Sequence, residues 1–221
     1  PLLDGAETVV CVEVDRKLCA LLEAEFGGRP GFRLVEGDLA RLDWRATLDL
    51  AGERPVVAGN LPYVLTSTVL FALAGLRDRV AGGVFMVQKE VADRMVAAPG
   101  SRSYGVLSVI LGSIFAMDIA RPVPRDVFWP KPEIASAVIR LAPGPGWEDG
   151  EFDRFSRVVR RAFEQRRKKL RSVLRGRFGY EQTQVEALAA EAGIDPDLRP
   201  EQIKPEQWRR LAQVLPLEDS E

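Results

Sequence analysis

The chain has 221 residues, of which 46% are hydrophobic and 29% charged, and its formal net charge is −1. Because it holds no histidine and two cysteines, Cys11 and Cys19, histidine-dependent catalytic triads and the common zinc sites are excluded, and we expect two buried thiols and no metal. The length suits one substantial core with a small second domain. No apolar run approaches the roughly 18 residues that span a bilayer, and no signal-peptide pattern is present, so we expect a cytoplasmic protein without a membrane segment.

Two strands are predicted near the start of the chain, and acidic residues follow each. Residues 8–12 form a nearly continuous apolar run, typical of a strand buried on both faces, and Glu13 follows. The strand at 32–35 leads into Gly37 and Asp38. At the carboxyl edge of an open α/β sheet, Glu13 can hold the hydroxyls of a ribose, and Asp38 can accept from an adenine amino group. The alternatives are a solvated strand end and an ordinary Gly-Asp turn.

The tetrapeptide Asn60-Leu61-Pro62-Tyr63 follows the apolar run at 55–59 and precedes a helix-like segment at 65–76. This order predicts a turn at the same carboxyl edge. The amino nitrogen of adenine is a poor nucleophile because its lone pair is delocalised into the ring. The Asn60 amide oxygen and the carbonyl of Leu61 or Pro62 can accept its hydrogens and localise that pair, while the Tyr63 ring offers a stacking face. The alternative is a plain turn in which Asn60 caps a helix and Tyr63 fills the core.

A proline-rich loop at 122–132 separates the last two predicted strands, at 114–120 and 135–141. Another strand is predicted at 83–87. The loop carries Phe128 and Trp129, and a proline-stiffened loop can present an aromatic plane at low entropic cost. For Trp129 we favour the alternative, a side chain packed within a connector.

A proline- and glycine-rich linker at 142–146 predicts a boundary between a catalytic domain at 1–143 and a helical domain at 147–221. Residues 151–180 hold eleven Lys/Arg and three Asp/Glu, a net charge of 11 − 3 = +8. On a helix predicted at 165–178, arginines at 167, 171 and 175 recur every fourth residue, apart from the apolar stripe. This pattern favours nucleic-acid contact over a merely solvated face.

Six motifs in a fixed order carry a family resemblance. They are Val12-Glu13-Val14-Asp15, Glu36-Gly37-Asp38, Asn60-Leu61-Pro62-Tyr63, Val87-Gln88-Lys89-Glu90-Val91-Ala92-Asp93-Arg94, Phe128-Trp129-Pro130-Lys131-Pro132-Glu133 and Ala162-Phe163-Glu164-Gln165-Arg166-Arg167-Lys168-Lys169-Leu170. The set closely resembles the small-subunit ribosomal RNA adenine N6,N6-dimethyltransferases of the KsgA (RsmA) type, over essentially the whole chain. Each motif alone is weak, whereas the ordered set is specific.

The resemblance implies an α/β, Rossmann-like methyltransferase domain that binds S-adenosylmethionine, followed by a small all-helical domain that grips ribosomal RNA. It implies that Glu13 holds the cofactor ribose and Asp38 the adenine amino group, and that Phe128 lies near the target base. The implied cofactor-binding set is Glu13, Val14, Gly37, Asp38, Leu39 and Asn60. The resemblance also implies that the target adenine is presented by Asn60, Leu61, Pro62 and Tyr63. The expected RNA-binding residues are Arg166, Arg167, Lys168, Lys169, Arg171 and Arg175.

We therefore expect transfer of two methyl groups, one after the other, from S-adenosylmethionine to adenine N6 in ribosomal RNA of the immature small subunit, by a monomeric enzyme. One alternative is a macrolide-resistance methyltransferase acting on large-subunit RNA, and another is a non-catalytic RNA-binding assembly factor of the same fold. Leu61 and the basic stretch favour the small-subunit type.

The family also carries a glycine-rich loop after a first strand, and no such loop precedes Glu13 here. A doubly wound domain without that strand leaves the edges of both neighbouring strands unpaired. We therefore expect the sequence to lack its beginning.

Overall fold

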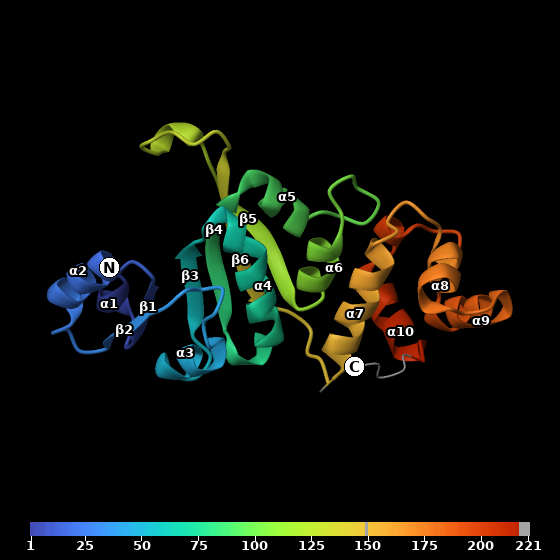
Figure 1. The fold of residues 1–221 in the computed structure, drawn as a ribbon, viewed down its shortest axis with the longest axis horizontal. Coiled ribbons are helices and arrows are strands. Elements are labelled where there is room, and N and C mark those ends of the chain that lie inside the picture. The colour runs from blue at the N-terminus through green and yellow to red at the C-terminus, as the bar shows by residue number, and fades with distance from the viewer. Residues whose placement is uncertain (149, 217–221) are drawn as a thin grey trace. The chain divides into compact units, whose positions relative to one another are not determined.

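The computed structural model describes residues 1–148 and 150–216, which group into two units. The first unit comprises residues 1–88 and 120–143, and the second comprises residues 89–119 with the described residues from 144 onward (Figure 1). The chain enters the second unit for the last time after Pro143, where the linker was predicted. Residues 89–119 group with the C-terminal helices in this division, and the domain boundary expected near residue 143 stays a prediction.

The first unit opens with a β-α-β segment. Strands β1 (Val9–Glu13) and β2 (Phe32–Glu36) pair in parallel and in register, so that Glu13 lies opposite Glu36. The short helix α1 (Leu2–Gly5) precedes them, and α2 (Arg16–Phe26) connects them. Asp15 caps α2, because its carboxylate accepts from the amides of Lys17 and Leu18 at 2.7 and 3.3 Å. The two strands therefore end side by side, at one carboxyl edge.

Four further strands form a second sheet in the order β3-β4-β6-β5. They are β3 (Val56–Asn60), β4 (Gly82–Gln88), β5 (Phe115–Val123) and β6 (Ser136–Pro143). Strand β3 runs parallel to β4, and β6 runs antiparallel to it. The register pairs Phe85 with Ile139 and Val87 with Ala137, all of which are buried. Since residues paired across a ladder share a face, this buried row specifies the register.

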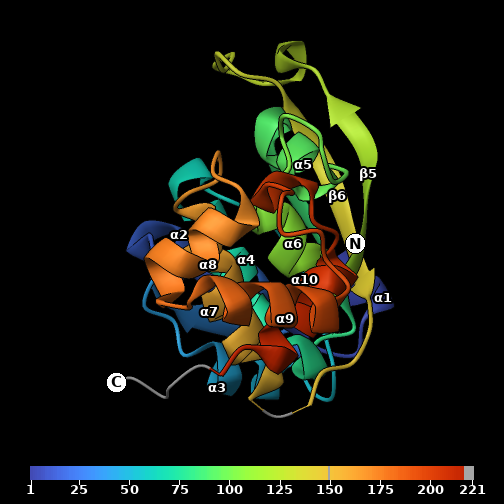
Figure 2. The same cartoon turned by 90° about the vertical axis from the view of Figure 1, so that its right-hand side faces the viewer.

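Helices of the first unit connect these strands. They are α3 (Trp44–Leu50), η1 (Tyr63–Leu65), α4 (Thr66–Gly75), η2 (Arg77–Arg79) and η3 (Arg125–Val127). Helix α4 buries Val69, Leu70 and Leu73, at the spacing of one helical face. The loop between β5 and β6, residues 124–135, projects beyond the ends of these strands (Figures 1 and 2).

The second unit is mainly helical, although it also includes residues 115–119 of β5. Its helices are α5 (Lys89–Met95), α6 (Val106–Gly112), α7 (Glu151–Phe163), α8 (Leu170–Phe178), α9 (Gln182–Ala192), η4 (Pro200–Gln202) and α10 (Pro205–Val214), and Figure 2 shows α7 to α10 from the front. Buried Tyr104 donates its hydroxyl to the Ile203 carbonyl at 2.8 Å, and the Trp147 indole donates to the Ser113 carbonyl at 3.0 Å. These bonds between distant segments explain why residues 89–119 belong to this unit.

The structure differs from the sequence prediction most clearly at the basic helix. The helix predicted at 165–178 begins only at Leu170, because the backbone of Lys169 is extended, with φ −64° and ψ 147°. The amides of Leu170 and Arg171, which have no partner within the helix, donate to the carbonyls of Leu198 and Pro196 at 2.7 and 2.9 Å. Arg167 therefore precedes the helix, and the predicted repeat of arginines at every fourth residue loses its first member.

Two smaller differences have local causes. Strand β5 continues through Pro122 although the prediction ended it at Ala120, because a proline is tolerated on an edge strand that need not donate its amide. The prediction also missed α3, whose N-cap Asp43 accepts from the Ala46 amide at 3.0 Å. Within residues 1–148 and 150–216, none of the helices has the length and apolarity that a bilayer-spanning segment needs.

Candidate active site at the strand ends

The Asn60 side chain closes β3 at the carboxyl edge of the second sheet. Asn60 lies opposite Met86 of β4, and the Leu61 amide donates to the Met86 carbonyl at 3.3 Å, which extends the pairing by one residue. Leu61 is buried and so anchors the turn, whereas Asn60 is exposed. Among the described residues, nothing forms a hydrogen bond with the Asn60 amide group. Its oxygen is therefore free to accept from a ligand.

The sequence left open whether the carbonyl of Leu61 or that of Pro62 is the second acceptor. The two carbonyls differ in the hydrogen bonds that they accept. The Pro62 carbonyl accepts two hydrogen bonds, from the Leu65 amide at 2.9 Å and from the Thr66 hydroxyl at 3.3 Å. Both donors lie where η1 ends and α4 begins. A carbonyl has two lone pairs, so both are engaged. In the described part of the chain, the Leu61 carbonyl accepts no hydrogen bond. Leu61 therefore supplies the free main-chain acceptor next to Asn60.

Tyr63 joins this turn to the last strand. Its hydroxyl lies 3.3 Å from Oγ of Ser136, the first residue of β6, and its side chain remains 42% exposed. Ser136 is buried and was missed in the sequence, where only a hydroxyl at the start of an apolar strand could have indicated it. Gln88 of β4 pairs with Ser136, so the ends of β3 and β4 and the start of β6 meet at this edge.

The aromatic residues of the loop at 124–135 take different positions. Phe128 is half-buried, and its amide donates to the Arg125 carbonyl at 3.3 Å. Trp129 is 98% exposed, so the expectation that it packs within a connector is wrong. The loop itself is bonded internally: the Arg125 guanidinium donates to the Glu133 carbonyl at 3.0 Å, and Lys131 forms an ion pair with Asp126.

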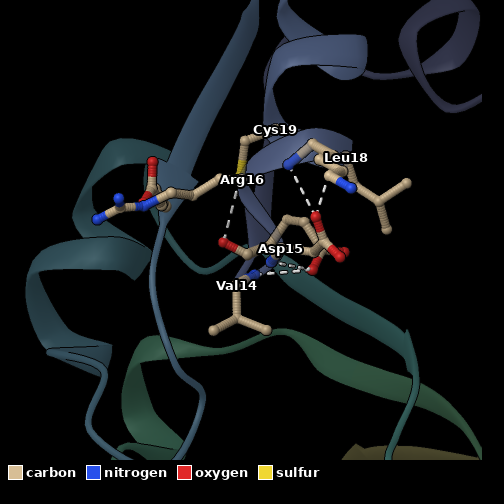
Figure 3. A network of polar contacts seen from close by, with 8 residues as sticks. Val14, Asp15, Arg16, Leu18 and Cys19 are labelled. Atoms are coloured by element: carbon tan, nitrogen blue, oxygen red, sulfur yellow. Dashed lines mark hydrogen bonds and ion pairs between the residues drawn. The ribbon is translucent and has the colours of Figure 1, made fainter.

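The acidic residues of the first sheet form a separate polar cluster, part of which Figure 3 shows. One carboxylate oxygen of Glu13 accepts from the amides of Val14 and Asp15 at 2.8 and 2.9 Å, and the Glu13 carbonyl accepts from the Gly37 amide at 2.9 Å. Glu13 and Gly37 thus lie together, with the Glu13 carboxylate held in one orientation. The Cys19 thiol lies 3.5 Å from the Glu13 carbonyl (Figure 3).

Asp38 stands next to this cluster and is exposed. One of its oxygens accepts from the Ala40 amide at 2.9 Å, which forms the turn that the Gly-Asp pair indicates. Leu39 is half-buried, and Val14 is 63% exposed. Glu13 and Asp38 belong to the sheet of β1 and β2, whereas Asn60 belongs to the sheet of β3, so their convergence on one site stays a prediction.

The six basic residues expected to bind RNA divide into two sets. Three form ion pairs within the second unit: Arg166 with Glu201 at 2.6 Å, and Lys169 and Arg171 with Asp197 at 3.2 and 2.7 Å. The other three, Arg167, Lys168 and Arg175, are exposed and have no ion-pair partner among the described residues. The exposed set is therefore the one with charge available for phosphates.

Known proteins resemble this chain throughout its length. A family model described as ribosomal RNA adenine dimethylase matches residues 1–216. The curated protein "Ribosomal RNA small subunit methyltransferase A" of Anaeromyxobacter sp. (strain K) is 40% identical over 223 residues, which cover 97% of this chain and 78% of that protein.

Two solved structures share the fold. A dimethyladenosine transferase from Plasmodium falciparum has a TM-score of 0.77 at 20% identity and covers 95% of this chain and 82% of its own. The 23S rRNA methyltransferase ErmE has a TM-score of 0.69 at 24% identity and covers 96% of this chain and 83% of its own. These likenesses confirm the predicted fold class, a Rossmann-like domain with a helical C-terminal part.

Proposed function

The chain belongs to the ribosomal RNA adenine dimethylase family, and from this membership we infer that it dimethylates the N6 amino group of adenines in small-subunit ribosomal RNA. Enzymes of this family take the methyl groups from S-adenosylmethionine. The curated relative is named for the small subunit, which favours this function over the large-subunit, macrolide-resistance type. Since that relative is named as a methyltransferase, an enzyme is also favoured over a non-catalytic assembly factor.

The observation that carries the assignment of the active site is the pair of free acceptors at the end of β3. The Asn60 amide oxygen and the Leu61 carbonyl are consecutive, and the Pro62 carbonyl is engaged in the next helix. When each acceptor takes one amino hydrogen of adenine, the nitrogen lone pair is localised and aimed away from the ring. The same acceptors stabilise the positive charge that develops on the nitrogen as it is methylated.

The second methylation uses the same geometry. A monomethylated amine keeps one hydrogen, so one of the two acceptors still orients it while the first methyl group takes the other direction. Tyr63, with its ring 42% exposed beside the turn, offers a stacking face for the extruded base, and Phe128 offers another.

The polar groups at the ends of β1 and β2 fit a bound nucleoside. Two backbone amides hold one oxygen of the Glu13 carboxylate, which leaves the other oxygen to accept from ribose hydroxyls. Asp38, exposed beyond Gly37, keeps one oxygen for an adenine amino group, with Val14 and Leu39 as apolar neighbours. The cofactor itself supplies an electrophilic methyl group on sulfur, and these residues act by binding and orienting it.

Ribosomal RNA is held, in this proposal, by exposed basic residues of the second unit. The phosphate contacts come from Arg167, Lys168 and Arg175. The side chains of Arg166, Lys169 and Arg171 are instead engaged in ion pairs within the unit. The substrate is the immature small subunit in the cytoplasm, and the enzyme acts as a monomer.

An Asn60→Ala variant tests the active site. We expect at least about a hundredfold loss of methyl transfer from labelled S-adenosylmethionine, because removing one preorganised hydrogen-bonding group costs about 10²–10³ in rate. Affinity for ribosomal RNA should remain within about twofold, because phosphate contacts dominate it. Ser67→Ala, a truncation of an exposed residue on the adjacent helix, is the matched control and should leave both quantities unchanged. Undiminished transfer by Asn60→Ala would refute the assignment.

A charge experiment tests the RNA-binding surface. Replacing Arg167, Lys168 and Arg175 together by glutamine should weaken RNA binding and reduce the slope of log K against log salt by about 2–3, because each lost phosphate contact removes about one unit. The charge-matched control replaces Lys17, Arg33 and Arg45, exposed residues of the first unit. An equal effect of both triple variants would show that net charge alone, and not this surface, governs binding.

A further inference from the structure

Trp129 is the most exposed large apolar side chain that the structure records. It lies in the loop between β5 and β6 with 98% of its surface accessible, and Val127 in the same loop is 64% exposed. The loop is nevertheless bonded internally, through the Arg125–Glu133 hydrogen bond and the Lys131–Asp126 ion pair. Both views show it projecting beyond the strands (Figures 1 and 2). These bonds restrict the backbone on both sides of Trp129, so the loop presents the indole at a small cost in backbone entropy.

The loop is rooted at the edge that carries the acceptor turn. Ser136, the first residue after the loop, lies within hydrogen-bond distance of the Tyr63 hydroxyl at 3.3 Å and pairs with Gln88 at the end of β4. Trp129 is therefore seven residues from a side chain that contacts the turn of Asn60 and Tyr63. Tyr63, Gln88, Trp129 and Ser136 all belong to the first unit.

We propose that Trp129 stacks on an RNA base next to the target adenine. The proposal rests on the proposed function, because an adenine that leaves its stack to reach Asn60 deprives its neighbours of a stacking partner. An exposed indole replaces that partner, and every base has a face that can use it. Arg125 and Lys131 are engaged within the loop, so the aromatic plane rather than charge recognises the RNA.

Substitution of Trp129 tests the proposal. Trp129→Ala should weaken binding to an oligoriboadenylate by about 5- to 150-fold, because base–aromatic stacking is worth about 1–3 kcal/mol per base and 1.4 kcal/mol is tenfold. With small ribosomal subunits lacking the modification as substrate, KM should rise by a similar factor while kcat changes little. Trp129→Phe keeps an aromatic plane and should retain most of the affinity. Val127→Ala, which removes exposed apolar surface from the same loop without an aromatic face, is the matched control.

A spectroscopic readout separates stacking from a structural role. The difference in fluorescence between the wild type and Trp129→Phe isolates Trp129, since the other tryptophans remain in both. Added oligoriboadenylate should protect this difference signal from quenching by acrylamide. Equal RNA affinity of Trp129→Ala and wild type would overturn the proposal, and so would equal losses in Trp129→Ala and Val127→Ala.

Further outcomes distinguish a failure of the stacking proposal from a failure of the active-site assignment. If Trp129→Ala weakens binding to whole subunits but not to naked RNA, the loop contacts a ribosomal protein and the proposal is wrong. If Asn60→Ala abolishes methyl transfer while Trp129→Ala changes nothing, the stacking proposal fails and the active site stands. Unimpaired transfer by Asn60→Ala would instead refute the active-site assignment beneath it.

Discussion

Removing the hydroxyl of Tyr104 tests the packing that joins residues 89–119 to the C-terminal helices. Tyr104 is 1% exposed, and its hydroxyl donates to the Ile203 carbonyl at 2.8 Å. The variant Tyr104→Phe deletes this bond without changing the ring. The Ile203 carbonyl is then left buried and without this donor, because Ile203 itself is 0% exposed.

The expected loss is about 2 kcal/mol of the free energy of unfolding. A neutral hydrogen bond contributes about 1 kcal/mol, and an unsatisfied buried carbonyl adds a desolvation cost that brings the total to about 1–3 kcal/mol. For a protein of this size, 2 kcal/mol corresponds to a decrease in Tm of about 4–8 °C. The control is Tyr180→Phe, in which the hydroxyl bonded to the Pro216 carbonyl at 2.9 Å lies at the surface. There we expect at most about 0.5 kcal/mol.

The buried hydroxyl of Tyr104 also makes the free energy of unfolding depend on pH. Burial first, and the negative charge of Glu206 second, raise the pKa of Tyr104 above its ordinary value. A group with a raised pKa in the folded state contributes stability that is fully present below the unfolded pKa, about 10 for tyrosine, and is lost as the pH rises above it. The difference in stability between wild type and Tyr104→Phe should therefore shrink by up to about 1.4 kcal/mol per pH unit above pH 10.

The assay is urea unfolding followed by far-UV circular dichroism, at pH 7 and between pH 9 and 11. The reasoning is refuted if Tyr104→Phe and Tyr180→Phe lower the stability equally at pH 7. It is also refuted if the difference between wild type and Tyr104→Phe stays constant up to pH 11, since the buried hydroxyl would then not resist ionisation.

Three further predictions concern the two units separately. Phe155→Ala, which truncates a fully buried ring 4.8 Å from the Trp147 ring, should cost about 3–5 kcal/mol in urea unfolding, and a loss below 1 kcal/mol would contradict the observed core. The hydrogen bond from Lys169, and then the charge of Arg171, lower the pKa of Asp197, so its stabilising effect is present above pH 4 and lost as the pH falls. Asp197→Asn should accordingly lower Tm at pH 7 but not at pH 2.5, and parallel Tm curves across this range would count against the ion pairs. Burial raises the pKa of the Cys11 and Cys19 thiols, so both should react with a disulfide reagent at pH 8 far more slowly than in the urea-unfolded chain; equal rates would mean that the thiols are accessible.

Local patterns in the sequence were sufficient to place most elements. The apolar runs at 8–12, 32–35 and 55–59 became β1, β2 and β3 with shifts of one residue at most. The expectation of burial on both faces is wrong for 8–12, because β1 is half-buried throughout, and β3 alternates between exposed and half-buried residues. The polar residues that end them, Glu13 and Asn60, are the last residues of their strands. Both features depend on neighbours in the chain, which the sequence displays directly.

The tertiary structure decided what depends on distant residues. Carbonyls at 196 and 198 accept the first amides of helix α8, and Asp197 and Glu201 determine which basic side chains are paired. Trp129 is exposed because no distant segment among the described residues packs on it, which the residues around it in the sequence do not reveal. Whether a side chain is buried, paired or free is set by contacts between segments that lie far apart along the chain, and no local pattern encodes those contacts. Residue types and their order therefore specified the chemistry, and the fold selected the side chains that remain available to perform it.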